Sequence, residues 1–453
     1  MKNNNAMKTN ILDMTEGNTT RLLVVFSIPM LIGNLFQQIY NLVDSIVVGQ
    51  YVGAGALAAI GATGSVVFLF IALCNGIGSG GGIVVSQLFG AKKHEDVKSA
   101  LTNIAYLMLG MAVAVSIISY CITPWLLTLL KTPDGIIADS IVYMRMQCIG
   151  LPLIAVYNYG ASVLRALGDS RGPLYFLIVS CILNVGMDIW FVNGLNFGVF
   201  GAALATVIAQ FMAGFGCLVY AWKTNEYFRL KKNNFAINNH QIKETVRLGI
   251  PMSLQFAMIA ISCMGLQAVV NSFGETAVAA FTATSRVEQL VHQPYTSLGA
   301  ALATYSGQNY GAKKLSRIKE GFKKSTFIMI GLSALLLVIM QFFGEAIVGL
   351  FVPDAAVIEM GAKGLKITSL FYAVLGMIYV TRGVQNGLGD AAFAMINGIV
   401  EVIARILLPA YLVTLPLFGK WGIWWSAGLV WLISAVACMW RYLSYGKVYS
   451  SKI

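Results

Sequence analysis

Long apolar stretches recur along the whole 453-residue chain, and their length is the feature that most limits its fold. A helix needs about 20 predominantly apolar residues to cross the hydrocarbon core of a bilayer. Twelve stretches are long enough, near residues 22–48, 56–82, 100–130, 140–166, 173–193, 199–222, 246–271, 277–304, 325–352, 364–386, 391–416 and 421–444. Their continuity excludes a β-barrel, whose strands alternate in polarity over about ten residues. The sequence therefore predicts an all-α polytopic membrane protein with twelve transmembrane helices.

The distribution of charge supports this class and predicts an orientation. Charged residues make up only 11% of the chain, although the formal net charge is +12. The basic residues gather at both termini and in the loops after the second, fourth, sixth, eighth and tenth spans. Lys and Arg show this bias on the cytoplasmic side of membrane proteins. We therefore expect a multi-pass protein of the inner or plasma membrane, with both termini in the cytoplasm and no nucleic-acid partner.

The two halves of the chain repeat. The segment Ser27–Met30 (SIPM) recurs as Gly249–Met252 (GIPM), and the prolines lie 222 residues apart. The segments Ser86–Lys93 and Gly307–Lys314 both end in GAKK, and LGD occurs at 167–169 and 388–390, each pair at a shift of 221. Six crossings per repeat predict a parallel repeat about an axis along the membrane normal, which is typical of secondary transporters. We expect two six-helix bundles, at 1–222 and 246–453, joined by a cytoplasmic linker at 223–245.

A buried charge marks the first span, Ile28 to Gly53. Gln37, Asn41 and Asp44 lie at i, i+4 and i+7, so they share one face of a helix. A carboxylate within hydrocarbon is costly and usually faces a bundle interior or an ion or substrate path. The alternative is a polar patch that only holds helices together.

The paired motifs, together with RVEQLVHQP at Arg286–Pro294, resemble those of the multidrug and toxic compound extrusion (MATE) family, over nearly the whole chain. The resemblance implies a non-enzymatic antiporter that exports amphipathic, often cationic drugs in exchange for protons or sodium. It also implies that Asp44, Asn184, Asp188 and Thr206 form the coupling site, and that Gln37 and Tyr40 line the cavity. Pro29 would be a hinge in the first span.

The spacing of these residues is compatible with one site. Asn184 and Asp188 lie one turn apart, as do Ala202 and Thr206 on the next span. Two close carboxyl groups in an apolar bundle suit proton binding. Their oxygens, with the Asn184 amide, the Thr206 hydroxyl and the Ala202 carbonyl, would equally suit Na⁺. A hydrogen-bonded network without transport function is the third reading.

The C-terminal half departs from one branch of the family, because its first span, 246–271, contains no acidic residue. Its intramembrane carboxylates are Glu288 and Glu401. Glu401 and Arg405 are spaced for an ion pair at i, i+4. The residues expected to line a substrate cavity are Gln37, Tyr40, Asn41, Arg286, Glu288 and Glu401.

Two rival functions remain open from the sequence. A lipid-linked precursor flippase would share the architecture, but it would need a cavity rich in basic residues to bind pyrophosphate. Within the expected spans, four carboxylates outnumber the three arginines Arg145, Arg286 and Arg405, which favours cationic cargo. A membrane-embedded transferase would need polar catalytic loops, which the short Lys-, Gly- and Asn-rich loops do not supply. We expect no cofactor beyond the coupling ion, small-molecule drugs and organic cations as cargo, and function as a monomer in the bilayer.

Overall fold

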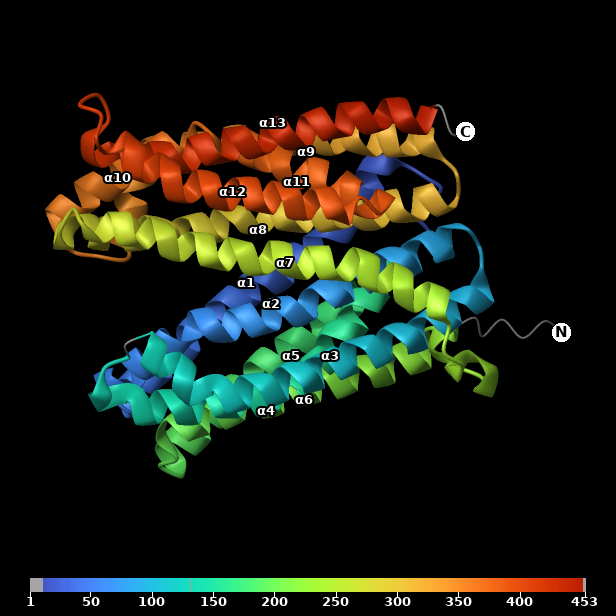
Figure 1. Cartoon of the computed structure of the whole chain (residues 1–453), viewed down its shortest axis with the longest axis horizontal. Coiled ribbons are helices and arrows are strands. Elements are labelled where there is room, and N and C mark those ends of the chain that lie inside the picture. Colours follow the sequence, from blue (N-terminus) through green and yellow to red (C-terminus); the bar gives the residue numbers. More distant parts are fainter. Residues whose placement is uncertain (1–10, 131, 451–453) are drawn as a thin grey trace. The chain divides into compact units, whose positions relative to one another are not determined.

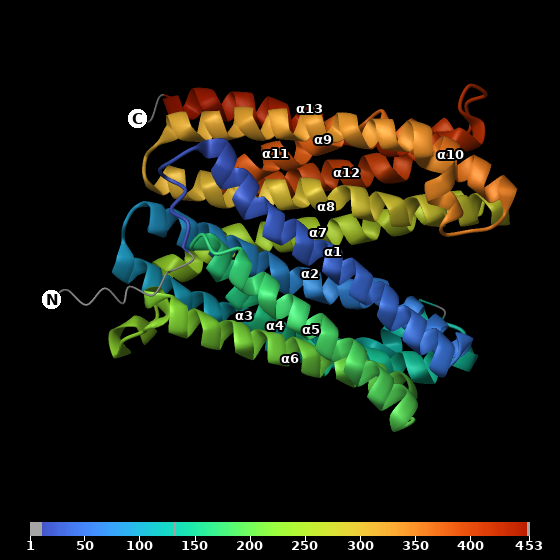
Figure 2. The same ribbon diagram turned by 180° about the vertical axis from the view of Figure 1, so that it is seen from behind.

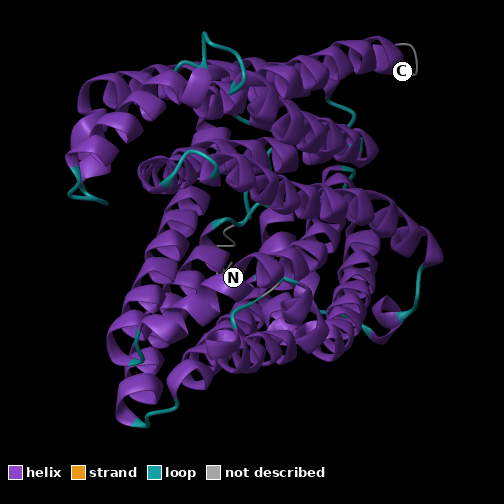
Figure 3. Cartoon of the chain, turned by 60° about the vertical axis from the view of Figure 1, so that its left-hand side comes forward, coloured by secondary structure: helices purple, strands orange, loops and turns teal. Residues whose placement is uncertain are grey.

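The computed structural model describes residues 11–130 and 132–450, and within these residues it contains helices and no strands (Figures 1 and 3). The long helices are α1 (Thr19–Tyr51), α2 (Ala54–Gly90), α3 (His94–Leu129), α4 (Asp134–Ala166), α5 (Arg171–Asp188), α6 (Gly198–Thr224), α7 (Asn239–Asn271), α8 (Glu275–Gly311), α9 (Leu315–Gly349), α10 (Ala355–Ser369), α11 (Tyr372–Leu388), α12 (Ala391–Leu412) and α13 (Gly422–Ser450). The short ones are η1 (Ile189–Gly194), η2 (Glu226–Phe228), η3 (Lys232–Phe235) and η4 (Gly419–Trp421).

The helices account for the twelve expected spans. Nine of them, within the described residues, are long and apolar enough to cross a bilayer, and α10 with α11 forms a tenth span that is bent by 51°. The remaining two, α7 and α8, contain 33 and 37 residues and carry more polar side chains. Large apolar side chains lie on the outside, with Phe342 79% and Leu350 83% exposed. Exposed apolar surface of this extent requires lipid rather than water around it.

Residue contacts divide the chain into two compact units. One contains Met1–Met14 and Ile28–Ser253, and the other contains Thr15–Ser27 and Leu254–Ile453. One division, after Met14, precedes α1, and the other two fall within α1 and α7, close to the repeated prolines Pro29 and Pro251. Helices α2 to α6 therefore belong to the first unit and α8 to α13 to the second; Figure 2 shows them from behind.

The backbone confirms the internal repeat. Left-handed residues, with positive φ, occur in pairs that are 221 residues apart: Gly53 and Gly274, Lys92 and Lys313, Gly168 and Gly389, Gly198 and Gly419. Each pair lies at the same place in its half, where one helix ends and the next begins. Since L-residues rarely adopt positive φ, these turns are specific marks of a shared architecture.

The repeated aspartate of the LGD motif fastens a turn to the last helix of its own half. Asp169 accepts hydrogen bonds from the backbone N–H groups of Arg171 and Gly172, and from the Tyr220 hydroxyl at 3.0 Å. Burial raises the pKa of the Asp169 carboxyl, and these hydrogen bonds oppose the rise. In the second half Asp390 instead forms an ion pair with Arg441, with Nε–Oδ2 at 2.8 Å. Arg441 follows Tyr220 by the same 221 residues. The aspartate therefore contacts the equivalent position of the last helix in both halves, through a hydrogen bond in the first and an ion pair in the second.

The segment expected to be a linker, 223–245, is mostly structured. It contains η2, η3 and the first turns of α7. Asn103 of α3 accepts a hydrogen bond from the Asn238 backbone N–H at 3.0 Å, and Thr102 donates to the Asn234 carbonyl. These contacts pack the segment against α3 in the first unit.

A glycine substitution tests the turn that follows α4. A Cβ at Gly168, where φ is +93°, would lie 2.2 Å from the Leu12 carbonyl oxygen. We expect Gly168→Ala to destabilise the protein by about 1–2 kcal/mol for the left-handed backbone, plus about 1–3 kcal/mol for the overlap. Gly53→Ala is the matched control, because φ is +114° there and no atom lies within 4 Å of the added Cβ. Thermal unfolding in detergent should give the larger loss for Gly168→Ala; equal losses would contradict the packing of the Leu12 segment against this turn.

Candidate functional site

The polar residues of α1 are divided between its surface and its interior contacts. Asp44 is 8% exposed, and Tyr40 is half-buried. Gln37 and Asn41 are exposed, although they share the helical face predicted from their spacing. Of these four residues of α1, only Asp44 and Tyr40 contribute to the buried site of the first unit.

Asn184 and Asp188 approach from α5, where both are almost fully buried, at 1% and 0% exposure. Asp188 is the last residue of α5, and the chain continues as the π-helical turn η1. Such turns are rare and occur frequently at functional sites. The sequence predicted both polar residues but gave no sign of this change in helix type.

The Thr206 hydroxyl joins three helices. It accepts hydrogen bonds from the Tyr40 hydroxyl of α1 at 3.3 Å and from Asn184 Nδ2 of α5 at 3.4 Å. It donates to the Ala202 carbonyl, one turn earlier in α6, at 3.1 Å. The predicted convergence of these residues is thus present in the structure, and Thr206 is at its centre.

Four oxygen atoms at this site are buried without a hydrogen-bond donor among the described residues. They are Asp44 Oδ1, Asn184 Oδ1 and both carboxyl oxygens of Asp188. The Asp44 and Asp188 carboxyl groups are close enough to interact electrostatically with each other and with Tyr143 of α4. Neither carboxyl group forms an ion pair with a basic side chain in the described part of the chain. Because uncompensated buried charge is strongly unfavourable, two ionised carboxyl groups without a basic partner would be a costly arrangement at this site.

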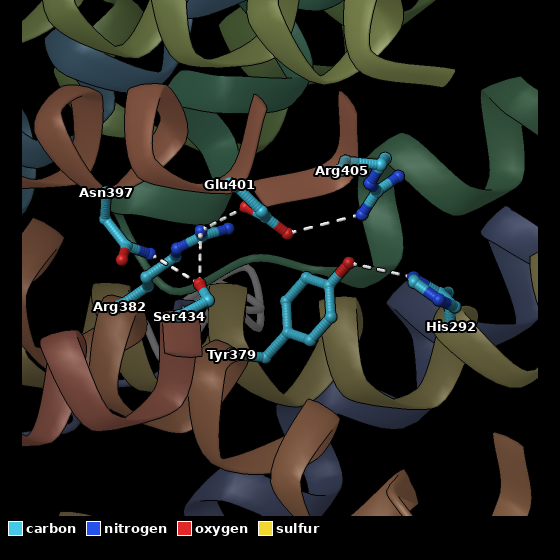
Figure 4. Close-up of polar contacts among 7 residues, drawn as sticks. All are labelled: His292, Tyr379, Arg382, Asn397, Glu401, Arg405 and Ser434. Atoms are coloured by element: carbon cyan, nitrogen blue, oxygen red, sulfur yellow. Dashed lines mark hydrogen bonds and ion pairs between the residues drawn. The ribbon is translucent and has the colours of Figure 1, made fainter. Parts of the chain in front are cut away.

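The second unit contains a different buried network, which Figure 4 shows. Arg382 of α11 forms an ion pair with Glu401 of α12 at 2.7 Å, and Arg405 approaches the other Glu401 oxygen at 3.5 Å. Arg382 also donates to Ser434 of α13, which accepts a further hydrogen bond from Asn397. Two guanidinium groups against one carboxylate give this cluster a net positive charge. Glu401 is therefore occupied by basic partners, and its role as a cavity residue stays a prediction.

An aromatic contact extends this network towards α8. The Tyr379 hydroxyl lies 3.1 Å from His292 Nδ1, and Trp431 packs edge-on against the imidazole (Figure 4 draws Tyr379 and His292). The network thus connects α8, α11, α12 and α13 within one unit.

Arg382 is a residue of this buried network that sequence reasoning missed. It lies close to the expected end of its span at 386, so its charge was compatible with a position at the membrane surface. In the structure it is only 8% exposed. The sequence did contain a sign of its burial. Arg382 and Gln385 lie three residues apart, so they share one face of α11, and both are buried.

The repeat relates the two networks. Arg405 follows Asn184 by 221 residues, so a guanidinium in the second unit takes the sequence position of the amide in the first. The first unit has unpaired carboxyl groups where the second has an internal cation. The chemistry of the site is therefore not duplicated, although the helices are.

Two other predicted residues lie apart from these networks. Arg286 is exposed on α8, and Pro29 is buried within α1. The hinge role of Pro29 stays a prediction, as does a cargo contact for Arg286. Glu288 lies in a third polar group, with Thr368 and Tyr372.

The chain was compared with known proteins. The sequence profile of the MatE family matches residues 29–190 and 251–411. The chain is 29% identical over 449 residues to the probable multidrug resistance protein YpnP of Bacillus subtilis, covering 97% of this chain and 98% of the relative. It is 24% identical to the multidrug export protein MepA of Staphylococcus saprophyticus, over 91% of each chain. A crystal structure described as MATE in the bent conformation is similar in fold, with a TM-score of 0.89, 24% identity, and 96% and 98% of the two chains covered.

Proposed function

Since the chain belongs to the MatE family of multidrug efflux transporters, we propose that it is a secondary active antiporter that exports amphipathic, often cationic compounds in exchange for H⁺ or Na⁺. The observation that carries the proposal is the group of four buried oxygens of Asp44, Asn184 and Asp188 that have no donor. Membrane-embedded carboxyl groups of this kind mark ion and proton pathways. Alternating access would expose the site to each side of the membrane in turn.

The hydrogen bonds at Thr206 favour a proton as the coupling ion. A hydroxyl oxygen has two lone pairs and one proton. Tyr40 and Asn184 donate to this oxygen, and its own proton is given to the Ala202 carbonyl. Thr206 would have to lose a donor before it could ligate Na⁺. A proton shared by Asp44 and Asp188 needs no such rearrangement.

The cargo path is proposed from the exposed polar residues. Gln37 and Asn41 of α1 lie outside the buried site but on the same helix as Asp44. Contact of cargo with this face would let α1 sense both cargo and ion, with Pro29 as its hinge. We place Arg286, Glu288 and Glu401 in the second unit as further candidates. The charge bias of the loops supports cytoplasmic termini, and the presence of both halves in one chain supports function as a monomer.

Transport into proteoliposomes tests the proposal. The purified protein would be reconstituted with a fluorescent organic cation, and a pH gradient or a sodium gradient would be imposed separately. We expect dye movement under the pH gradient and none under sodium alone. Movement under sodium alone would identify Na⁺ as the coupling ion. No movement of any cationic dye under either gradient, with folded protein, would contradict the antiporter proposal and favour a lipid flippase.

A further inference from the structure

Glu288 of α8 is a membrane-embedded carboxyl group that the coupling site does not use. Its Oε1 atom accepts hydrogen bonds from the Thr368 hydroxyl at 2.5 Å and from the Tyr372 hydroxyl at 3.0 Å. Its Oε2 atom is buried and receives no hydrogen bond from the described residues. The two oxygens are therefore in different environments, one doubly hydrogen-bonded and the other without a partner.

Among the described residues, no basic side chain pairs with this carboxyl group. Glu288 forms no ion pair in the described part of the chain, and Arg286, two residues away, is exposed. The titratable groups that face Glu288 are phenols, Tyr372 of α11 and Tyr295 of α8 itself. Glu401, in contrast, is held by two arginines in the same unit. Of these two carboxyl groups, only Glu288 lacks the partner that an ionised form requires within hydrocarbon.

The neighbouring packing surfaces contribute hydroxyl and indole groups rather than charges. Ser333 of α9 is hydrogen-bonded to Tyr295 at 2.8 Å, and Trp424 of α13 donates to Thr284 of α8 at 3.2 Å. These contacts fix α8 beside α9 and α13. They supply no positive charge that could compensate an ionised Glu288.

The two donors lie on opposite sides of a break in one span. Thr368 is near the end of α10, Tyr372 is the first residue of α11, and the two helices meet at a bend of 51°. The equivalent part of the first half, around Gln147 and Leu151, lies within the continuous helix α4. The break is thus a feature of the second half only, and the Glu288 carboxyl group bonds to both of its sides.

We propose that Glu288 is a second proton-binding site, in the second unit, where Oε2 carries the proton and Oε1 holds α10 and α11 through Thr368 and Tyr372. Protonation of Oε2 removes the uncompensated charge. Loss of the proton strengthens both hydroxyl contacts, because hydrogen bonds to a charged acceptor are stronger. Proton binding therefore changes how firmly α8 is tied to the bent span. The site is separate from the one proposed for Asp44 and Asp188.

Infrared spectroscopy of the full chain in lipid tests this site directly, because a protonated carboxyl group has its own C=O stretching band. The background is the Asp44→Asn/Asp188→Asn variant, so that the first unit contributes no such band. At neutral pH we expect a band that Glu288→Gln removes and Glu359→Gln, a change at an exposed carboxyl group of α10, leaves in place. If the background variant fails to fold, the difference between the wild-type and Glu288→Gln spectra gives the same information.

Tyr372→Phe provides the test of the hydrogen bond. Without the Tyr372 hydroxyl donor, the ionised form of Glu288 is less stable relative to the protonated form. The pH midpoint of the band should therefore rise by about one pH unit, which is a tenfold increase in proton affinity. Absence of the neutral-pH band, its persistence in Glu288→Gln, or its appearance only after removal of Na⁺ would each overturn the proposal. None of these results depends on whether the first unit couples transport, because its carboxyl groups are absent from the background.

Discussion

Replacing Asp188 by Asn is expected to abolish gradient-driven export while the protein remains folded. Asp188 is completely buried, and both of its carboxyl oxygens lack a donor among the described residues. Asn has nearly the same volume but cannot share a proton with Asp44 or neutralise Na⁺. A loss of about 3 kcal/mol of ion affinity, as for a hydrogen bond to a charged group, reduces coupled transport about 100-fold. Dye export in proteoliposomes under a pH gradient measures this.

Stability separates this result from misfolding. Removing one of two unpaired carboxyl groups relieves repulsion, so thermal unfolding of Asp188→Asn should occur at or above the wild-type temperature. Asp44→Asn should behave in the same way, since its carboxyl group faces that of Asp188. Glu359→Gln is the control, with an exposed carboxyl group and unchanged export expected. Wild-type export by either Asp variant would remove the coupling role from this site.

Replacing Arg382 by Met is expected to produce the largest loss of stability. Of the two ion pairs that Glu401 forms, the one with Arg382 is shorter, at 2.7 Å. The side chains of Arg382 and Glu401 are each 9% exposed. Removing one partner of a buried ion pair costs about 3–5 kcal/mol, and here Glu401 would keep only the longer contact with Arg405, at 3.5 Å. The Ser434 contact is lost as well. Thermal unfolding in detergent, followed by circular dichroism, is the measurement.

Two further variants show whether the lost ion pair causes this decrease in stability. Arg382→Met/Glu401→Leu/Arg405→Met removes all three charges of the cluster and should recover most of the stability, because replacing a whole buried ionic group with apolar groups is often neutral. Arg405→Met should cost less than Arg382→Met, since its distance to Glu401 is 3.5 Å and its side chain is 16% exposed. A triple variant no more stable than Arg382→Met would show that packing, and not charge, accounts for the effect.

The architecture was predictable because lipid imposes a length and a polarity on each span. The twelve apolar stretches and the repeated motifs gave the helix count and the two halves, and the structure confirms both. Helix ends were less predictable, since helices extend past the apolar core. For example, α2 continues to Gly90, whereas the apolar stretch ends near 82. The break between α10 and α11 was not predictable, because no proline lies at Ser369 to Tyr372.

The polar sites were predictable only where residues close in sequence share a helix face. Asn184 and Asp188 lie one turn apart, and the family resemblance indicated Asp44 and Thr206 as their partners. Spacing placed Gln37 and Asn41 on the same helix face as Asp44, but it could not show that only Asp44 is buried, because burial depends on the neighbouring helices. The Arg382–Glu401 pair joins two helices, 19 residues apart in sequence, and such contacts depend on tertiary packing.

The most direct test of the central claim is whether cargo movement drives the coupling ion through the site of the first unit. Coupling between two ligands is reciprocal, so an outward gradient of a cationic dye should move protons in the opposite direction. A pH indicator trapped inside proteoliposomes would record this for wild type, Asp188→Asn and Glu359→Gln. We predict proton movement in wild type and Glu359→Gln and none in Asp188→Asn. Proton movement of equal size in Asp188→Asn would contradict the assignment of ion coupling to Asp44 and Asp188.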